Sequence, residues 1–302
     1  MGDYQAAFDE YRALLGTEPN NTKYNYRIAI SILESNIEQK SKAIYYLEKV
    51  CEAADAPKDA LYQLARAYHQ GFKFYKALHA LNDFLETSKD DDLNEKACRL
   101  IENCNVAIDL IKTPLPVKIE NLGPDINSAE PDYYPFVAED ESILIYTTRR
   151  NKGNGGYEMV DGYKTAEIFI AKEKRGTWGK ARSIGGMVGS GYDEEIVGLS
   201  NDGEYLFVNL DTWEISGEIM ITTKKGRQFQ KPQLLGPSVN TNYLEVTATV
   251  SRDKETLYFA SNRPGGYGNS DLYYSKLLPT GEYGDPINMG PQFNTPYDEY
   301  FP

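Results

Sequence analysis

Two different spacings of apolar positions divide the chain near residue 115. Up to about residue 112, Ala, Leu and Tyr recur three and four positions apart, the spacing of an amphipathic helix. From about residue 119, short apolar runs alternate with Gly, Asp and Asn, which is typical of strands joined by tight turns. Between them, Pro114 and Pro116 cannot continue a helix. We therefore predict a multidomain α-then-β chain, with a helical domain at 1–112, a linker at 113–118 and a strand domain at 119–302.

The strand domain contains a block that recurs three times and begins a fourth time. The clearest copy starts at Asn240 with N-T-N-Y-L-E-V, continues with S-R-D-K-E-T-L-Y-F-A-S-N-R-P-G-G-Y-G-N-S-D-L-Y-Y, and ends with G-D-P-I-N-M-G. Other copies begin at Asn127 and near Gly189, and N-T-P-Y-D-E-Y-F-P opens a further one at Asn294. The first copy is longer, which predicts a surface loop at Lys152–Lys164. A fixed period of this size indicates a repeat architecture.

Each copy predicts four short strands. The second strand follows Asp202-Gly203 or Asp253-Lys254, and Asp-Gly favours a tight hairpin because both turn residues tolerate positive φ. The third strand carries Glu167–Phe169, Glu218–Met220 or Asp271–Tyr273. The last strand is expected to carry an aromatic residue before a polar turn: Trp178, Phe229 or Tyr283. Four strands per repeat describe the blades of a propeller.

These blocks resemble the WD40-like, TolB-type propeller repeats of bacterial envelope proteins, including the OmpA family of Bacteroidetes. The resemblance covers about 119–302 and rests on N-T-x-Y-D-E-x-x-P, S-x-D-G-x-x-L-Y-F, S-x-R-x-G-G-x-G-x-x-D-[IL]-Y and the closing x-P-x-N-[LM]-G-P. The second copy departs from it, with Asn209-Leu210-Asp211 in place of S-N-R and no Gly-Gly turn. The resemblance implies a β-propeller with about three blades and the start of a fourth in this chain, and the rest beyond Pro302.

The helical domain resembles tetratricopeptide repeats over about residues 3–110, which implies an α-helical solenoid with a concave groove. Ala43 and Ala77 are 34 residues apart, as expected for small residues where paired helices touch. Asn36–Ser41 is expected to lengthen one turn, and a further helix is predicted from about Leu93 to Ile111. The expected core positions are Ile28, Ala29, Ile32, Ala43, Leu47, Leu61, Leu64, Ala65, Tyr68, Ala77 and Leu81.

In such repeats the first helix of each pair lines the groove. Repeats starting at Thr22 and Lys58 place on this face Lys23, Tyr26, Ile30, Leu33, Asp59, Tyr62, Arg66 and His69. Tyr and Arg often anchor interfaces, so the candidate partner-binding residues are Tyr26, Tyr62, Arg66 and His69. Tyr62 and Arg66 are expected to lie outside the core. The alternative is that this face packs against the propeller or is only solvated.

Charge and chemistry exclude several classes of function. The net charge is −13, which disfavours binding to a phosphate backbone, so no nucleic-acid partner is expected. The sequence has no apolar run long enough to span a membrane, and no signal sequence, so an envelope protein would appear here in mature form. The two histidines, His69 and His79, both precede the strand domain, and no G-x-S-x-G segment occurs. We therefore expect no catalytic residues and no enzyme.

No cofactor or metal site is expected. Cys51, Cys98 and Cys104 have no C-x-x-C spacing and are interpreted as small core residues of helices. Pro264–Gly268 looks like a phosphate loop, but it precedes no helix and is interpreted as a turn that needs positive φ. Acidic runs occur at Asp90–Asp92, Asp193–Glu195 and Asp298–Glu299 without calcium-loop spacing; the first is interpreted as the charged start of a helix.

Arg150 and Arg263 recur at matching positions after the second strand. One interpretation is a structural salt bridge repeated in two blades, and the other is a ligand-facing arginine on the propeller rim. Recurrence favours the salt bridge.

No chemical site emerges, so the expected function comes from the resemblance. It implies a non-enzymatic scaffold or adaptor, periplasmic or associated with the outer membrane, that binds other envelope proteins. In some relatives such a protein tethers a type IX secretion and gliding complex, and an OmpA-like domain, here after Pro302, holds peptidoglycan. The alternatives are the propeller of a peptidase with a downstream hydrolase domain, and a glycan- or peptide-binding sensor.

Overall fold

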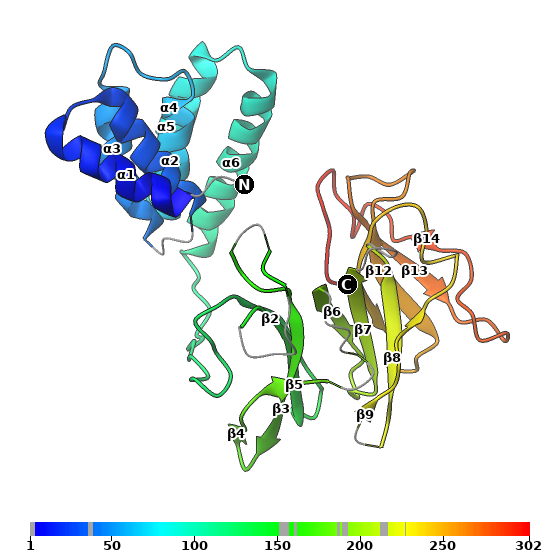
Figure 1. Ribbon diagram of the computed structural model, residues 1–302. Coiled ribbons are helices and arrows are strands. Elements are labelled where there is room, and N and C mark those ends of the chain that lie inside the picture. The colour runs from blue at the N-terminus through cyan, green and yellow to red at the C-terminus, as the bar shows by residue number, and fades with distance from the viewer. Residues whose placement is uncertain are drawn as a thin grey trace. The chain divides into compact units, whose positions relative to one another are not determined.

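The computed structural model describes residues 4–35, 39–150, 157–159, 162–185, 188, 193–211, 217–226 and 228–302. The chain divides into two compact units, Met1–Lys118 and Ile119–Pro302. The first is helical and the second is built of antiparallel strands (Figure 1). Within the described residues, no helix combines the length and the apolarity needed to cross a membrane. About half of the expected loop at Lys152–Lys164, the start of the second copy near Gly189 and half of Asn36–Ser41 lie outside the described residues.

The helical unit contains six described α-helices and one short 3-10 helix. They are α1 (Tyr4–Thr17), α2 (Thr22–Glu34), η1 (Lys40–Lys42), α3 (Ala43–Cys51), α4 (Ala60–Gln70), α5 (Phe74–Thr87) and α6 (Asp91–Leu110). Asn21 caps α2 by accepting from the backbone N–H of Tyr24, and Asp90 caps α6 by accepting from that of Leu93. Asp91 and Asp92 lie in the first turn of α6, where negative charge stabilises a helix. The predicted role of this acidic run is confirmed.

The core of the helical unit follows the predicted helical spacing. Of the expected core positions only Leu61 is half-buried, and the rest are buried. Ala43 and Ala77 have no exposed surface, so they allow helices to approach closely. Gly71 serves the same purpose in the turn after α4, because a Cβ there would lie 3.0 Å from Ile44 Cδ1.

The cysteines differ in environment. Cys104 is buried, Cys51 is half-buried and Cys98 is exposed. The prediction that all three are core residues is wrong for Cys98, because six residues along α6 turn its side chain away from the side that Cys104 occupies. Burial raises the pKa of both the Cys104 thiol and the Cys51 thiol, the latter to about 11.

In the part of the strand unit that the structure describes there are three antiparallel sheets, each formed by consecutive strands. The first contains β1 (Asp132–Val137), β2 (Ile143–Thr148), β3 (Glu167–Lys174), β4 (Thr177–Trp178) and β5 (Arg182–Ser183). The second contains β6 (Asp193–Leu199), β7 (Tyr205–Asp211), β8 (Ile219–Lys225), β9 (Gln228–Phe229) and β10 (Gln233–Leu234). The third contains β11 (Glu245–Val250), β12 (Thr256–Ser261), β13 (Asp271–Lys276) and β14 (Ile287–Asn288).

The outermost strand of each sheet differs from the prediction. Trp178, Phe229 and Tyr283 do not lie in it but in a short extension of the third strand's hairpin: β4, β9 and the Leu277–Tyr283 bridge. The outermost strands β5, β10 and β14 follow four residues later and pair with β3, β8 and β13. The aromatic residue thus lies in the hairpin that extends the third strand, and the chain then turns back so that the outermost strand pairs with the third strand.

The hairpin turns place positive φ at only one of the two predicted residues. It falls on Glu141, Gly203 and Lys254, with φ of 55°, 69° and 64°. The preceding aspartate is a hydrogen-bond acceptor instead. Asp202 accepts from Ser200 Oγ at 2.6 Å and from the Glu204 N–H at 3.1 Å, an Asx-type arrangement that fixes the turn.

The three sheets pack face to face in chain order. Along β7, Leu206 and Val208 join a core with the first sheet, whereas Phe207 joins a core with the third, as period-two alternation requires. Gly198 on β6 allows close approach to β11, because a Cβ there would lie 1.6 Å from the carbonyl oxygen of Ala248.

One backbone contact recurs wherever a repeat begins. The N–H of Glu194 donates to the Ala166 carbonyl at 3.1 Å, that of Glu245 to Gly217 at 3.2 Å, and that of Glu299 to Ser270 at 2.8 Å. Each acceptor lies just before or at the start of the third strand of the preceding sheet. The segment from Asn294 therefore docks on the third sheet as the starts of the earlier repeats dock on theirs.

Candidate functional site

The candidate groove residues meet between α4 and α6. A hollow of about 220 Å³ is lined there by Tyr62, Arg66, His69, Gln70, Lys96, Arg99, Leu100 and Asn103. Three of the four predicted partner-binding residues, Tyr62, Arg66 and His69, lie together in this hollow. Tyr26 on α2 does not line it.

Tyr26 instead connects two helices. Its hydroxyl donates to Oδ2 of Asp59 at 2.6 Å, and Asp59 also accepts from Gln63 Nε2 at 3.0 Å. Burial, reinforced by Asp59, raises the pKa of Tyr26 well above its usual range. Tyr26 and Asp59 thus satisfy each other and hold α2 against the start of α4.

The other predicted positions on α2 are less open than expected. Lys23 is exposed and Ile30 is half-buried. Leu33 is 5% exposed and belongs to the core, so its placement on a groove face is wrong. Its side chain packs within the core cluster that the helices share.

Tyr62 and Arg66 are more engaged than expected. The Tyr62 ring lies 5.8 Å from that of Phe84, and the half-buried side chain packs against the core without being one of its buried members. Burial raises the pKa of Tyr62. Arg66 donates through Nη1 to Glu34 Oε1 at 2.7 Å and to Gln63 Oε1 at 2.8 Å, which fixes the guanidinium at the edge of the hollow.

The hollow is positively charged although the whole chain is acidic. Arg66, Lys96 and Arg99 line it, Arg66 being paired with Glu34 at its edge, and no acidic side chain is among the described residues of the lining. Burial lowers the pKa of His69, which favours the neutral form of its imidazole. Such a lining favours an acidic or carboxylate-bearing segment, with Tyr62 and Leu100 as apolar contacts.

The residues that α6 contributes to the hollow were not among the predicted ones. Lys96, Arg99, Leu100 and Asn103 are spaced by three and four, so they share one face of the helix. That spacing was visible in the predicted helix from about Leu93 to Ile111, but which face it turned toward α4 was not.

A larger hollow lies at the starts of α4 and α6. It measures about 850 Å³ and is lined by Lys58, Asp59, Phe84, Thr87, Ser88, Lys89, Asp90 and Leu93. The two hollows share no lining residue, and the larger one also includes the end of α5. A hollow between two helices, like that between α4 and α6, suits an extended or helical protein segment.

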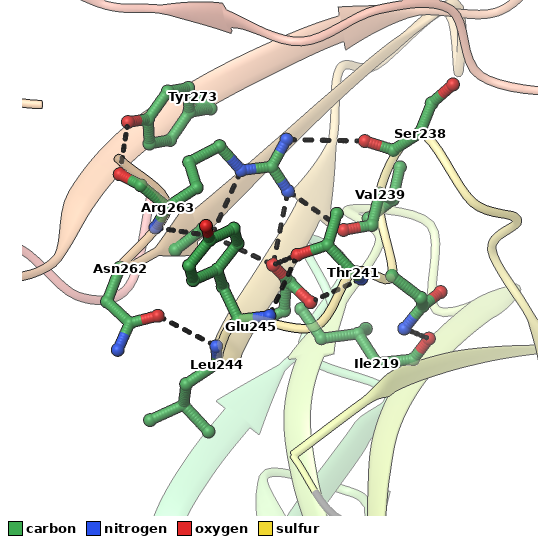
Figure 2. A network of polar contacts seen from close by, with 12 residues as sticks. Ile219, Ser238, Val239, Thr241, Leu244, Glu245, Asn262, Arg263 and Tyr273 are labelled. Carbon is green, nitrogen blue, oxygen red and sulfur yellow. Dashed lines mark hydrogen bonds and ion pairs between the residues drawn. The ribbon is translucent and has the colours of Figure 1, made fainter. Parts of the chain in front are cut away.

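In the strand unit, Arg263 is the centre of a buried polar cluster (Figure 2). Its Nη2 donates to Glu245 Oε1 at 3.2 Å and to the Val239 carbonyl at 2.9 Å, and its Nε donates to Ser261 Oγ at 3.1 Å. The guanidinium also lies 4.8 Å from the centroid of the Phe259 ring. The guanidinium is therefore fully engaged in contacts with residues of its own repeat.

Arg150 repeats this cluster in the first sheet. Its Nη2 donates to Asp132 Oδ1 at 2.9 Å and to the Ile126 carbonyl at 2.6 Å, and its Nε donates to Thr148 Oγ1 at 3.0 Å. Burial would raise the pKa of Asp132, but hydrogen bonds from Thr148, Arg150 and the Ser128 N–H outweigh it and hold that pKa below its usual value. The interpretation of Arg150 and Arg263 as recurrent salt bridges is confirmed, and they are not ligand-facing.

The acidic residue of each cluster also caps the start of its repeat. Ser128, Thr241 and Thr295 each donate both the backbone N–H and the hydroxyl to the carboxylate four residues later: Asp132, Glu245 and Glu299. The recurring N-T-x-Y-D-E segment thus has a structural role, because its own hydrogen bonds fix the start of the repeat. Asp298 likewise accepts from the Ser270 N–H at 3.1 Å.

The Pro264–Gly268 turn encloses a carboxylate of the protein itself. Asp271 accepts from the N–H groups of Tyr267 and Gly268 at 2.7 and 2.9 Å, so the amides that a phosphate would need are occupied. Within this turn, Gly265 is the one residue with positive φ. Gly266 and Gly268 are required for close approach instead, since a Cβ would lie 2.3 Å from Asp271 Oδ2 and 1.8 Å from the Tyr297 carbonyl oxygen. Across the described residues, no cluster of His, Cys, Asp and Glu has the arrangement of a metal site.

Comparisons with known proteins add little. No protein-family model and no curated protein matches the chain. Among solved structures, TolB from Acinetobacter baumannii aligns with a TM-score of 0.34 at 16% identity, covering 53% of this chain and 33% of that one. The tricorn protease aligns at 0.31 and 13% identity (51% and 14% covered), and a prolyl endopeptidase at 0.32 and 13% identity (60% and 24% covered). The chain spans a third or less of each, and similarity at this level does not establish a shared fold or function.

Proposed function

We propose that the protein is a non-enzymatic scaffold or adaptor of the bacterial cell envelope, in which the helical unit binds a protein segment between α4 and α6. The observation that carries this proposal is the cationic lining of the hollow by Arg66, Lys96 and Arg99 beside Tyr62 and Leu100. The occupant is an acidic segment with at least one apolar anchor, because complementary charge guides association and a buried aromatic contact supplies affinity.

The finer architecture is part of the same proposal. The helices form tetratricopeptide-type pairs, supported by the 34-residue spacing of the fully buried Ala43 and Ala77. The sheets are propeller blades, supported by their consecutive antiparallel strands and by the contact that recurs at Glu194, Glu245 and Glu299. A periplasmic or outer-membrane-associated place, a role in a type IX secretion complex, and a peptidoglycan contact through a region after Pro302 follow from the sequence resemblance.

Each of the two alternative functions predicts a different experimental result. If the sheets belong to a peptidase, a nucleophile and a histidine must come from another part of the protein, and purified protein that includes it should turn over peptide substrates. If the strand unit is a glycan or peptide sensor, the isolated unit should bind such ligands with the helical unit absent.

Charge reversal in the groove tests the main proposal. Lys96→Glu together with Arg99→Glu should weaken capture of the partner from envelope extract by about 1–4 kcal/mol, with a strong dependence on salt. Lys42→Glu with Lys73→Glu is the matched control, because both lysines are exposed on other parts of the helical unit. Equal recovery by the groove variant and the control would show that this groove is not the binding site.

A further inference from the structure

Three large apolar side chains are exposed at the end of the helical unit where α4 stops. Phe72 lies in the turn after α4 and is 81% exposed, and Val106 and Leu110, near the end of α6, are 57% and 64% exposed. We call these three residues the apolar end of the groove between α4 and α6. Exposed apolar side chains that gather beside a polar site, in contrast to single scattered ones, mark an interaction surface.

On α6 the two apolar residues share a face with the lining of the hollow. One stripe along this helix, with intervals of three and four residues, contains Lys96, Arg99, Asn103, Val106 and Leu110. The stripe changes from cationic to apolar toward the end of α6, and it contains no acidic residue. The hollow and the apolar end are therefore parts of one continuous surface of α6.

The lengths of the helices place the apolar part of this stripe beyond α4. Short turns join α4 to α5 and α5 to α6, so α4 and α6 run in the same direction. α4 has 11 residues and α6 has 20. The last turn of α4, with His69 and Gln70, lines the hollow together with Asn103. From Asn103 to Leu110, α6 continues for about 10 Å, so Val106 and Leu110 extend the groove past the end of α4.

Phe72 is connected to the hollow through two ring contacts. Its ring centroid lies 6.1 Å from that of Phe74, and the Phe74 ring lies 5.5 Å from the imidazole of His69, which lines the hollow. The backbone of Phe72 has φ of 57°, a left-handed conformation that is costly for a bulky residue and open to glycine. The chain thus has a strained, exposed phenylalanine where glycine would fit the turn better, which favours a role for the ring outside folding.

We propose that the partner is a protein segment with an acidic part and an apolar part, bound along α6 in a fixed direction. The acidic side chains meet the cationic end of the groove (Arg66, Lys96 and Arg99), and a large apolar side chain packs against the apolar end. Charge complementarity selects the occupant, and the continuous stripe on α6 joins the two ends. This inference rests on the proposed partner binding in the groove, and it adds the composition of the occupant and the order of its parts.

The distance between the two parts follows from the stripe. Arg99 and Val106 are seven residues apart on α6, a rise of about 10 Å. An acidic and an apolar side chain of the partner should therefore be about seven residues apart if the segment is helical, and about three if it is extended. A segment that has only one of the two parts can occupy only one end of the groove.

Peptide selection on the whole 302-residue chain tests this composition. The probe is a phage-displayed library of random peptides of about 16 residues, which span both ends of the groove even as a helix. We expect the enriched peptides to contain Asp or Glu and, at one of the two spacings, Phe, Trp, Leu or Ile. Enriched acidic peptides without an apolar residue at such a spacing would overturn the inference and leave the groove as the binding site. No enriched peptide, or peptides that bind equally to Lys96→Glu with Arg99→Glu, would overturn both.

Variants of the apolar end test its contribution to binding. Phe72→Gly removes the ring and relieves the turn, so it should weaken binding of an enriched peptide at least about 10-fold, while the Tm stays equal or rises. Val106→Ala with Leu110→Ala should weaken binding similarly, because alanine keeps α6 helical and removes only the apolar contact. Tyr45→Ala is the matched control: it removes a 58% exposed aromatic ring from α3 and should leave the affinity unchanged. Wild-type affinity in either variant of the apolar end, or a lower Tm of Phe72→Gly, would overturn the inference.

Discussion

Nη2 of Arg263 lies 3.2 Å from Oε1 of Glu245, a side chain with no exposed surface. Arg150 and Asp132 repeat this relationship in the first sheet at 2.9 Å. In both sheets the carboxylate also caps the repeat start, so one buried acid joins the start of a repeat to its second strand. Removing one partner of such a pair leaves a charge buried without compensation.

Arg263→Ala should therefore destabilise the strand unit strongly. We expect a loss of about 3–5 kcal/mol in the free energy of unfolding, because Glu245 would lose its counter-charge in a site closed to water. Chemical denaturation of the protein, followed by a probe in the strand unit, measures it. Arg252→Ala is the control: Arg252 pairs with Glu139 at an exposed position, where solvent screens the pair, so its loss should leave the stability close to that of the wild type. Equal effects of the two variants would contradict the structural role of Arg263.

Gly198→Ala should weaken the packing of the second sheet on the third. The added Cβ would overlap the Ala248 carbonyl oxygen, and the backbone must shift to relieve that overlap, at a cost of about 1–3 kcal/mol or more. Thermal unfolding reports the loss. At Gly284, in the third sheet, a Cβ would make an ordinary contact of 3.4 Å with Leu278 Cδ2. Gly284→Ala should therefore unfold near the wild-type temperature, and a Tm for Gly198→Ala that matches it would refute the close approach.

The turn at Asp202 should contribute stability that depends on pH. Partial burial opposes ionisation there, but hydrogen bonds from Lys254, Ser200 and the Glu204 N–H outweigh it and lower the pKa of Asp202 to about 2. The folded pKa is below the unfolded value, so this contribution is full above about pH 4 and is lost as pH falls toward 2. Asp202 is 47% exposed, so solvent screening limits the contribution to about 1 kcal/mol or less. The stability difference between wild type and Asp202→Asn should shrink between pH 5 and about pH 2; a difference that stays constant over this range would contradict it.

The three thiols should react at different rates. Cys98 is exposed, whereas Cys104 is buried and Cys51 half-buried, and the raised thiol pKa of the latter two lowers their thiolate fraction. A disulfide reagent at pH 8 should label one thiol rapidly in the native protein. Cys98→Ser should abolish that fast phase, and Cys51→Ser should leave it. A fast phase that survives Cys98→Ser would show that α6 is turned differently.

The sequence by itself determined the order of elements and their repetition. Alternation and turn residues placed β7 and β12 correctly, and helical spacing placed the core from Ile28 to Leu81, because both patterns are local consequences of which face is buried.

Only the tertiary structure decided what individual side chains do. These partners of Arg150 and Arg263 lie 18 to 25 positions away along the chain, so the role of either arginine could not be predicted from its local sequence alone. Cys98 is exposed, Tyr62 packs against the core, and α6 completes the hollow beside α4, because the rotation of each helix is set by packing against its neighbours and not by its own spacing. Gly268 is required by the carbonyl of Tyr297, a contact that exists only once the next repeat docks.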